Sequence, residues 1–567
     1  MLLYSYNHVI HGFSARLTSS QALEIKNSPA HIAVHEEKPG RMIDSGVWPE
    51  SKIFNEKGMP PIPTRWKGKC HNSTINPFRC NRKLIGAHVL IKGSQAAGES
   101  GLPDNTPRDF LGHGTHTSST AAGNHVPGAS QFGYVNGVAR GIAPGAHVAM
   151  YKVSSGEFIV ESDVLAAMDQ AIADGVDIMS LSLASGNDGE PNTTHNSAPW
   201  ITTVDAGTLD RSFTATVTLG NNQTFEGKSE FPNRVLVLDA SLYYGKSDFD
   251  KAICRTGALN ESEVFGQVVL CDYDNTISVP EQAEELAING AAAGILISNE
   301  IPYDTGELSI PSLILPFSSG ALIKKYATES ADARVKIMRF VLTSFGTKPA
   351  PQVADFSSRG PDPVNPNILK PNIIAPRVHV LAAFPPTIPI QQFDNYFWLQ
   401  ITHYYQAHQY YGAGHINPNK AMDPGLIYDI DWQGYVDFLC GLGYNDTEMK
   451  DILRQCQWNC SQEGSDVNYP SFVAMFSTGS SNVKNFDRVV TNVGDEQSVY
   501  HAVVETSYGM TFRVEPTTLT FTSKYQKQSF VASVQTYGKS PPVAYGYLKW
   551  VDQNGHIVAS PVVVQNS

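Results

Sequence analysis

An alternation of apolar segments in the first third of the chain constrains the fold most. "HVAMYKVSS" is predicted to form a strand, and "VDIMSLSL" a second strand. Between them, "SDVLAAMDQAIADG" is predicted to form a helix that begins at a Ser162 cap and ends at Gly175. Leu165, Met168 and Ile172 share one face of this helix. Two strands joined by one helix are typical of a parallel α/β sheet with helices on its faces.

Composition and charge exclude several classes of function. The 567 residues exceed what one hydrophobic core usually serves, so we expect about three or four domains. Forty-one basic and 54 acidic side chains give a net charge of −13 without a Lys/Arg cluster, which argues against a nucleic-acid partner. We expect no membrane span, because no apolar stretch is long enough. "MLLYSYNHVIHGF" lacks the basic start and apolar core of a secretion signal.

Cysteines and glycosylation patterns indicate in which cellular compartment such a chain is found. The cysteines fall in local groups without C-x-x-C spacing, and these are Cys70 with Cys80, Cys254 with Cys271, and Cys440, Cys456 and Cys460. Such separations suit local disulfides, although the pairing of the last three stays open. The pattern N-x-[ST] occurs at Asn72, Asn192, Asn222, Asn260, Asn445 and Asn459. Together these features favour a chain whose relatives are secreted over a cytosolic one.

Three further segments have predicted secondary structure that lies outside this α/β unit. Residues 1–37 are predicted to form a strand, a serine-capped helix and a second strand, "HIAVHEE". Residues 235–345 contain "QVVLCDYD", a helix through "EQAEELAINGAAAG" and "GILISN", as a self-contained inserted α/β domain would. After residue 466 the chain is predicted to be an all-β sandwich, with a hairpin turn at Asn554-Gly555.

The candidate site begins with "DFLGHGTHTSST", which places His113 and His116 three positions apart. Such a pair could bind a metal, but no Cys, Asp or Glu at a matching offset supplies a third ligand, so we predict no metal site. Both could instead be polar residues at the start of a helix. In "MIDSGVWPES", Asp44 ends a short apolar strand. Such an Asp is either a turn-former or the acid that orients a histidine in a nucleophilic triad.

On these motifs the chain resembles plant subtilisin-like serine proteases of the subtilase family over nearly its whole length. "IDSGVWPES" is similar to the family's aspartate motif and "GHGTHTSSTAAG" to its histidine motif. "GVARGIAPGAHVAMYKV", "FSSRGPD", "ILKPNIIAP" and "GAGHINPNKAMDPGLIYD" resemble further core segments. The resemblance implies that Asp44 is the orienting acid, His113 the general base and His116 a structural residue. It assigns Asn187, in "ASGNDG", the donor of the oxyanion hole.

The resemblance also implies an architecture, with a subtilisin-like doubly wound parallel sheet at its core. Residues 1–37 look like the remnant of an inhibitory propeptide that acts as the enzyme's own inhibitor. Residues 40–234 and 346–465 form the two parts of the catalytic core, 235–345 an inserted protease-associated domain, and 466–567 a fibronectin-III-like sandwich. For the insert and the sandwich, plain scaffolding is the alternative role. The family acts on protein or peptide substrates without a cofactor, and is secreted to the extracellular space (apoplast).

The sequence departs from the family at the nucleophile. Relatives carry their serine in a Gly-Thr-Ser-Met motif downstream of "ILKPNIIAP", whereas this chain has no serine between Ser358 and Ser461. "MSLSLASGNDG" and "HEEKPGRMIDSG" likewise join segments that are separated in relatives. Arg377 stands where the family has a glycine after "AP".

These losses fall as clean blocks between intact motifs. Skipped exons or a faulty gene prediction would give this pattern, and so would selection for a non-catalytic protein that acts in binding or as a decoy. In both cases the chain as written is predicted to be an inactive serine-type endopeptidase. The loss of the nucleophile's helix is also expected to leave apolar sheet surface uncovered. The sequence does not predict substrate specificity or oligomeric state.

Overall fold

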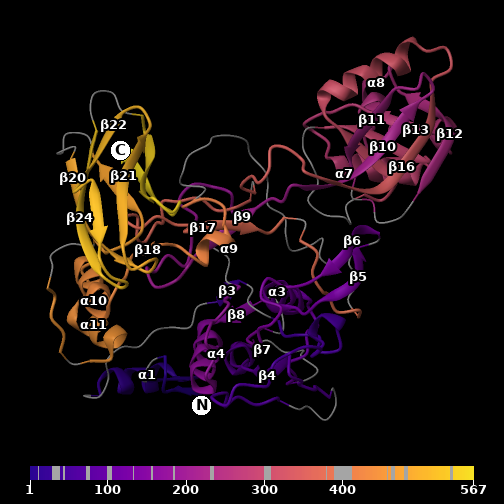
Figure 1. Ribbon diagram of the computed structural model, residues 1–567. Helices are drawn as coiled ribbons and strands as arrows, with labels where there is room; N and C mark the ends of the chain where they lie inside the picture. Colours follow the sequence, from indigo (N-terminus) through magenta and orange to yellow (C-terminus); the bar gives the residue numbers. More distant parts are fainter. Residues whose placement is uncertain are drawn as a thin grey trace.

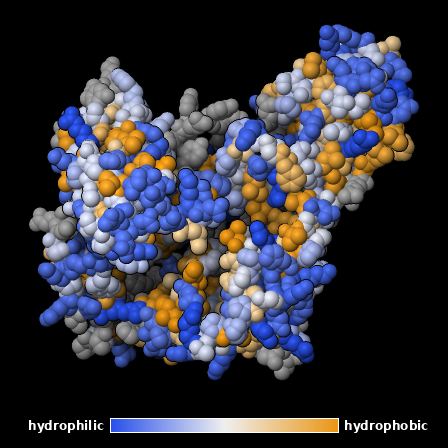
Figure 2. All heavy atoms as spheres, viewed as in Figure 1, coloured by the Kyte–Doolittle hydropathy of each residue, from blue (hydrophilic) through white to orange (hydrophobic). Residues whose placement is uncertain are grey.

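The protein consists of three lobes, formed by the N-terminal, middle and C-terminal parts of the chain (Figure 1). The computed structural model describes all residues except 10–11, 29–38, 42–44, 72–76, 99–104, 132, 155–157, 183–185, 230, 232–234, 299–307, 355, 379, 388–411, 456, 462–465, 478–482, 537–540 and 567. The face shown in Figure 2 is hollowed between the C-terminal and N-terminal lobes.

The N-terminal segment is a hairpin followed by a helix. Its elements are β1 (Leu2–Tyr6), β2 (Gly12–Ala15) and α1 (Ser19–Lys26). The predicted strand and helix are confirmed, but the N-cap is Thr18 rather than a serine. Thr18 forms a capping box with Gln21, in which each side chain accepts a hydrogen bond from the other's backbone N–H. The second predicted strand, "HIAVHEE", lies outside the described residues.

The N-terminal lobe contains the first strand and the helix of the predicted α/β unit. Its elements are β3 (Pro39–Arg41), η1 (Lys52–Phe54), β4 (Leu84–Val89), α2 (Lys92–Ala97), α3 (His113–Ala122), β5 (Val126–Gln131), β6 (Tyr134–Ala139), β7 (Val148–Lys152), β8 (Phe158–Val160) and α4 (Glu161–Asp174). Strands β4 and β7 pair in parallel. Helix α4 ends at Gly175 with φ 86°, as predicted, because glycine adopts this conformation without strain. Its N-cap is Val160, and Ser162 is buried inside the first turn.

The second strand of the α/β unit, predicted in "VDIMSLSL", is wrong for the residues described, because 176–182 form no strand. Strand β9 (Val204–Gly207) pairs instead in parallel with β17 (Ile373–Pro376) in a separate two-stranded sheet. The end of the unpaired segment is tied elsewhere, since the carbonyl of Gly186 accepts a hydrogen bond from Ser358 N (3.4 Å). Two apolar side chains of this segment face solvent, since Ile178 is 84% and Leu181 39% exposed.

The predicted face of α4 is also only partly covered. Ile172 is 45% exposed, and Leu165 and Met168 are half-buried. The buried positions include Ala167 and Ala171 instead. A helix buries the face that its neighbours cover, and the segment expected to cover this one forms no strand.

A closed barrel of seven strands forms the middle lobe. Its elements are β10 (Arg211–Leu219), β11 (Thr224–Lys228), β12 (Leu236–Tyr244), α5 (Phe249–Ala252), α6 (Glu261–Val264), β13 (Val268–Cys271), α7 (Val279–Ile288), β14 (Ala293–Ile297), β15 (Ser312–Leu315), α8 (Phe317–Glu329) and β16 (Arg334–Phe345). The predicted order of strand, helix and strand is confirmed as β13, α7 and β14. The predicted start at residue 235 is too late, because β10 pairs with β16, and β11 with β15, inside the same barrel.

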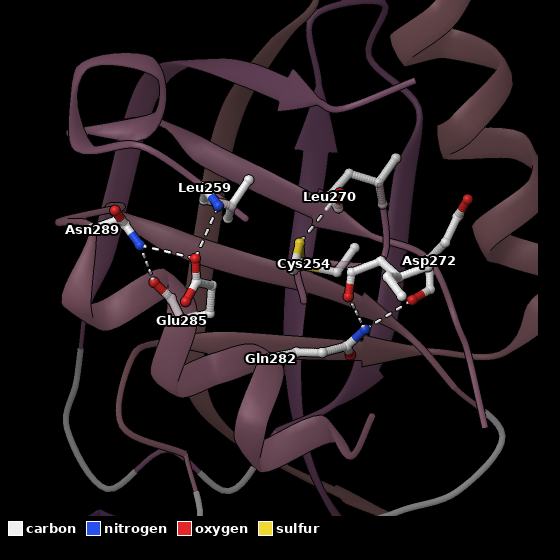
Figure 3. The surroundings of a disulfide bond; sticks show 9 residues. Cys254, Leu259, Leu270, Asp272, Gln282, Glu285 and Asn289 are labelled. Carbon is white, nitrogen blue, oxygen red and sulfur yellow. Dashed lines mark hydrogen bonds between the residues drawn. A yellow bond between two sulfur atoms is a disulfide. The ribbon is translucent and has the colours of Figure 1, made fainter. Parts of the chain in front are cut away.

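The disulfide between Cys254 and Cys271 joins the loop after α5 to β13 (Figure 3). The side-chain amide of Gln282 on α7 donates two 2.8 Å hydrogen bonds to the backbone carbonyls next to these cysteines. Glu285, one turn further along α7, accepts a 2.9 Å hydrogen bond from the N–H of Leu259. The helix is therefore bound to both sides of the disulfide loop.

Replacing Cys254 and Cys271 by serine is expected to destabilise the barrel by about 3 kcal/mol, because the cross-link closes a short loop in the unfolded chain. Hydrogen exchange of the amides of β13 and α7 should accelerate accordingly. The same change at Cys440 and Cys460 is the control and should leave the barrel's exchange unaltered. Unchanged protection of β13 in the first variant would contradict the prediction.

A short helical region leads to the C-terminal lobe. Its elements are α9 (Pro418–Ala421), β18 (Leu426–Ile427), α10 (Trp432–Gly441) and α11 (Asp446–Leu453). The disulfide Cys440–Cys460 closes this region and settles the pairing that the sequence left open. Cys456 lies outside the described residues. The other two predicted local pairs, Cys70–Cys80 and Cys254–Cys271, are confirmed.

The C-terminal lobe is a sandwich of two sheets, as predicted. Its strands are β19 (Phe472–Phe476), β20 (Val483–Asn492), β21 (Ser498–Thr506), β22 (Met510–Glu515), β23 (Thr518–Phe521), β24 (Lys527–Thr536), β25 (Val543–Asp552) and β26 (Ile557–Asn566). One sheet has the order β18-β20-β24-β22 and the other β19-β26-β25-β21-β23. Trp550, Tyr500 and Phe472 are fully buried between them. The hairpin turn at Asn554-Gly555 is confirmed between β25 and β26.

Candidate active site

The predicted base, His113, is the first residue of α3. A fully buried carboxylate, Asp109, fixes the start of this helix. It accepts hydrogen bonds from the N–H groups of Leu111 (3.0 Å), Gly112 (2.7 Å) and Thr115 (2.9 Å), and from the Thr115 hydroxyl (2.6 Å). A carboxylate at this position satisfies the free N–H groups of the first turn and opposes the positive end of the helix dipole.

Asp44 lies outside the described residues, but the residues that follow it pack against α3. The Ser45 hydroxyl donates a 2.8 Å hydrogen bond to Asp109 and accepts one of 3.0 Å from Gly114 N. A Cβ atom on Gly114 would lie 2.0 Å from the carbonyl oxygen of Gly46, so only glycine permits this approach. The backbone after the predicted acid is therefore held against the helix that begins with the predicted base.

His116, one turn along α3, was predicted to be a packing residue, but the structure leaves it exposed. Partial burial lowers the pKa of His116, and positive charge on His113 and Arg377 lowers it further. Its imidazole therefore lies close to a second basic group as well as to the predicted base. Among the described residues, no three His, Cys, Asp or Glu side chains form a group that could hold a metal ion.

Asn187, the predicted oxyanion donor, is held by Arg377. Arg377 Nη1 donates a 2.7 Å hydrogen bond to Asn187 Oδ1, although 190 residues separate the two. The backbone N–H of Arg377 donates to the Gly207 carbonyl (2.9 Å), and its guanidinium lies 5.2 Å from the ring centre of Phe356. Because arginine has donors only, this contact turns the amide oxygen of Asn187 towards Arg377 and leaves its N–H₂ group for another acceptor.

A buried carboxylate, Asp205, lies near Arg377. Asp205 is in β9, opposite Ile374 of β17, and is 4% exposed. Within the described part of the chain, neither of its oxygens makes a hydrogen bond of good geometry, and the Ser357 hydroxyl is the polar group beside it. Burial raises the pKa of Asp205 to about 7, and the Ser357 hydroxyl and, after it, the positive charge of Arg377 oppose this rise. The group therefore changes charge near neutral pH.

The serines described beside these residues have structural roles. The Ser358 hydroxyl accepts a hydrogen bond from Asp188 N (3.2 Å), and that of Ser357 accepts one from Ala206 N (3.2 Å). Both serines are buried. The segment in which relatives are expected to carry the nucleophile includes residues 388–411, which lie outside the described residues and contain no serine in the sequence.

The N-terminal segment docks on α4 through two carboxylates. The Tyr4 hydroxyl donates a 2.7 Å hydrogen bond to Asp163, which is fully buried. Asp169 accepts hydrogen bonds from three successive backbone N–H groups, those of Asn7 (3.1 Å), His8 and Val9 (2.7 Å). The segment after β1 is therefore held by one face of α4.

Sequence reasoning missed several of these residues. For Asp109 a signal existed, because an Asp shortly before a helical segment is typical of a cap. Asp163 and Asp169 stood out only as carboxylates in a helix with apolar residues, and their partners are about 160 positions away. The pairing of Arg377 with Asn187 had no local signal.

The chain belongs to the subtilase family. A family model described as "Subtilase family" matches residues 43–414, one described as "Peptidase inhibitor I9" matches 1–42, and "Fibronectin type-III domain" matches 466–564. The predicted family, inhibitory propeptide and C-terminal module are thus confirmed at this level. No helix of the described structure has the length and apolar character needed to cross a membrane.

Individual relatives show the same family over nearly the whole chain. Subtilisin-like protease SBT1.6 of Arabidopsis thaliana is 32% identical, with 99% of this chain and 92% of the relative covered. Subtilisin-like protease SBT3 of Solanum lycopersicum is 32% identical (99% and 90% covered). Subtilisin-like protease SBT1.5 of Arabidopsis thaliana is 34% identical (99% and 91% covered). The first alignment spans 708 positions against 567 residues in this chain, so at least 141 of them face gaps here.

Proposed function

We propose that this chain is a subtilisin-like serine endopeptidase by architecture and is catalytically silent as written. In this proposal Asp44 orients His113, His113 is the general base, and Asn187 donates to an oxyanion through its N–H₂ group. No residue takes the part of the nucleophile. Hydrolysis of a peptide bond through an acyl-enzyme needs that residue, because His113 and Asp44 otherwise have no hydroxyl to activate.

One observation carries the assignment of the acid and the base. Ser45 and Gly46 pack against the first turn of α3 through the Asp109 and Gly114 contacts. This packing supports a position for Asp44 beside the helix that begins at His113. The hydrogen bond from Arg377 supports the role of Asn187, because it leaves the amide N–H₂ group free to donate.

The expected loss of turnover follows from the role of the nucleophile. In subtilisin, removal of the nucleophile lowers turnover by about 10⁶-fold, because the remaining groups only bind and polarise the substrate. The alignments with two relatives span 708 and 715 positions against 567 residues here, which supports a loss of chain segments. The second candidate is a non-catalytic binding or decoy protein, and it is supported by the intact barrel and sandwich.

The outer parts of the chain fit the same proposal. Residues 1–37 are the remnant of an inhibitory propeptide. The residues from 40 to the start of β10 at Arg211, together with 346–465, form a core derived from a doubly wound sheet. The insert, predicted at 235–345, is a protease-associated domain that includes the whole barrel, and 466–567 form the fibronectin-III-like module. The protein is secreted and glycosylated, which is supported by three disulfides and by exposed N-x-[ST] asparagines such as Asn222 and Asn260.

Labelling of the purified full chain with a fluorophosphonate tests whether the chain is catalytically silent. We expect no labelling, because the reagent needs a serine activated by His113. Robust labelling would refute the proposal. The genomic sequence between the codons for residues 390 and 412 distinguishes a missing exon from a selected non-catalytic protein. An open exon there that encodes Gly-Thr-Ser-Met would exclude the binding or decoy protein.

A further inference from the structure

The carboxyl end of β17 carries a fixed cation that the proposed triad does not use. Arg377 follows β17 directly, and ligands of open parallel α/β sheets bind at this edge. Its contacts with Asn187 (2.7 Å) and Phe356 (5.2 Å to the ring centre) hold the guanidinium, and its backbone N–H donates to the Gly207 carbonyl (2.9 Å). The residue nevertheless stays exposed. The charge is therefore fixed in position and open to a ligand.

The donors that remain match one chemical group. Within the described residues, the Arg377 side chain has no second hydrogen bond, and the amide nitrogen of Asn187 has none. A guanidinium presents its N–H groups as a planar fork that suits the two oxygens of a carboxylate. The N–H₂ group of Asn187 adds a neutral donor beside it. A carboxylate would satisfy both residues together.

We propose that Arg377 and Asn187 bind the free carboxylate at the C-terminal end of a peptide. The proposal rests on the proposed function, under which Asn187 faces the carbonyl of a bound peptide chain. A peptide that ends at this point presents a carboxylate where an uncut chain presents a neutral carbonyl. A site with a fixed cation and without a nucleophile prefers the cut end. The chain therefore captures the products of proteolysis instead of producing them.

Asp205 makes this binding depend on pH. When ionised, its buried carboxylate offsets the charge of Arg377, and burial places its pKa at about 7. Below that pH Asp205 is neutral, so the bound carboxylate meets an uncompensated cation and binds more tightly. His116 on α3, whose pKa burial lowers from its ordinary value of 6.5, gains positive charge at lower pH and acts in the same direction. Asp188 and Glu190, which follow Asn187, and Arg359, near Phe356, are further charged groups in the described part of the flanking loops.

Fluorescence anisotropy of the full chain with labelled pentapeptides tests the proposal. A set of peptides that differ in the last residue is prepared in two forms, one with a free C-terminal carboxylate and one with a C-terminal amide. We expect the acid form to bind about ten-fold more tightly than the amide form, because it alone makes charge-assisted hydrogen bonds. An amide-ended peptide with a final glutamate distinguishes a side-chain carboxylate, and inorganic phosphate as a competitor distinguishes a simple anion site.

Three substitutions test which residues cause the preference for the acid form. Arg377→Gln should reduce the preference for the acid form to within about two-fold. Arg513→Gln removes an exposed cation in the C-terminal lobe and should leave the preference unchanged. Asp205→Asn should give tight binding of the acid form at about pH 8 as well as pH 6, apart from the part due to His116. Circular dichroism checks that each variant is folded.

Three outcomes would overturn the proposal: equal affinity for acid and amide, an unchanged preference in Arg377→Gln, or no binding of any peptide. Preferential binding of the glutamate side chain or of phosphate would also refute a site for C-terminal ends. Fluorophosphonate labelling would refute the proposal that the chain is catalytically silent. It would leave the comparison of acid-ended and amide-ended peptides valid. The two proposals can therefore fail separately.

Discussion

Replacement of Asp109 by alanine is expected to lower the local free energy of unfolding around α3 by about 3–5 kcal/mol. The carboxylate accepts hydrogen bonds from three backbone N–H groups at the start of α3, from Thr115 Oγ1 and from Ser45 Oγ, and it is fully buried. Its loss leaves these donors without acceptors in the interior. Exchange of the α3 amides with solvent should accelerate by on the order of 100-fold or more.

Two comparisons separate this effect from simple loss of volume or charge. Asp109→Asn keeps the volume of the side chain but turns one acceptor into a donor that faces other donors, so we expect a loss of similar size. Asp177→Ala removes an exposed carboxylate that pairs with Arg65, and should cost at most about 1 kcal/mol. Wild-type exchange rates in Asp109→Ala would show that Asp109 does not hold the helix.

The hydrogen bonds of Asp109 also affect the candidate active site. Ser45 joins Asp109 and Gly114, and the residue before Ser45 is Asp44. A variant that loses the carboxylate of Asp109 therefore loosens both Ser45 and the helix that begins at His113. One buried side chain, itself without a chemical role, thus joins the segment that begins at Ser45 to the helix of the proposed base.

Local sequence patterns predicted those elements whose partners are also local. Helix α4, the order β13-α7-β14, the β25-β26 hairpin and two disulfides depend on contacts within a short stretch of chain, and all four are confirmed. The strand expected at 176–182 is wrong because a strand also needs neighbours from distant segments. Its apolar pattern is intact, yet in the described core β9 pairs with β17 and not with this segment.

In the candidate site, too, the sequence predicted features with local partners and missed those that depend on distant segments. The sequence offered a helix start as one alternative for His113 and His116, and α3 does begin at His113, whereas the role of His113 as a base stays a prediction. The sequence marked Arg377 as unusual only by its departure from the family. That it binds Asn187 depends on two loops far apart in the chain. Asp205 likewise has no motif, and only its burial in β9 makes it a titratable group near neutral pH.

Replacement of Asp169 by alanine is expected to weaken the docking of the N-terminal segment on α4 by about 100-fold. The carboxylate accepts hydrogen bonds from the N–H groups of Asn7, His8 and Val9, and no other described side chain accepts from them. The amides of these three residues should lose protection from hydrogen exchange at pH 7. Glu161→Ala, an exposed carboxylate in the first turn of the same helix, should leave them protected.

The same contact predicts that docking weakens in acid. Burial raises the pKa of Asp169, but the N–H donors of Val9, His8 and Asn7 outweigh it and hold this pKa below its ordinary value of 3.8. Its contribution is therefore complete above that value and is lost as the pH falls through the lowered pKa. Asp163 acts in the opposite direction, because burial raises its pKa and protonation favours its buried state. Asp169→Asn should therefore abolish the rise in exchange that acid produces in the unmodified chain. If acid still releases the segment in this variant, another carboxyl group controls the docking.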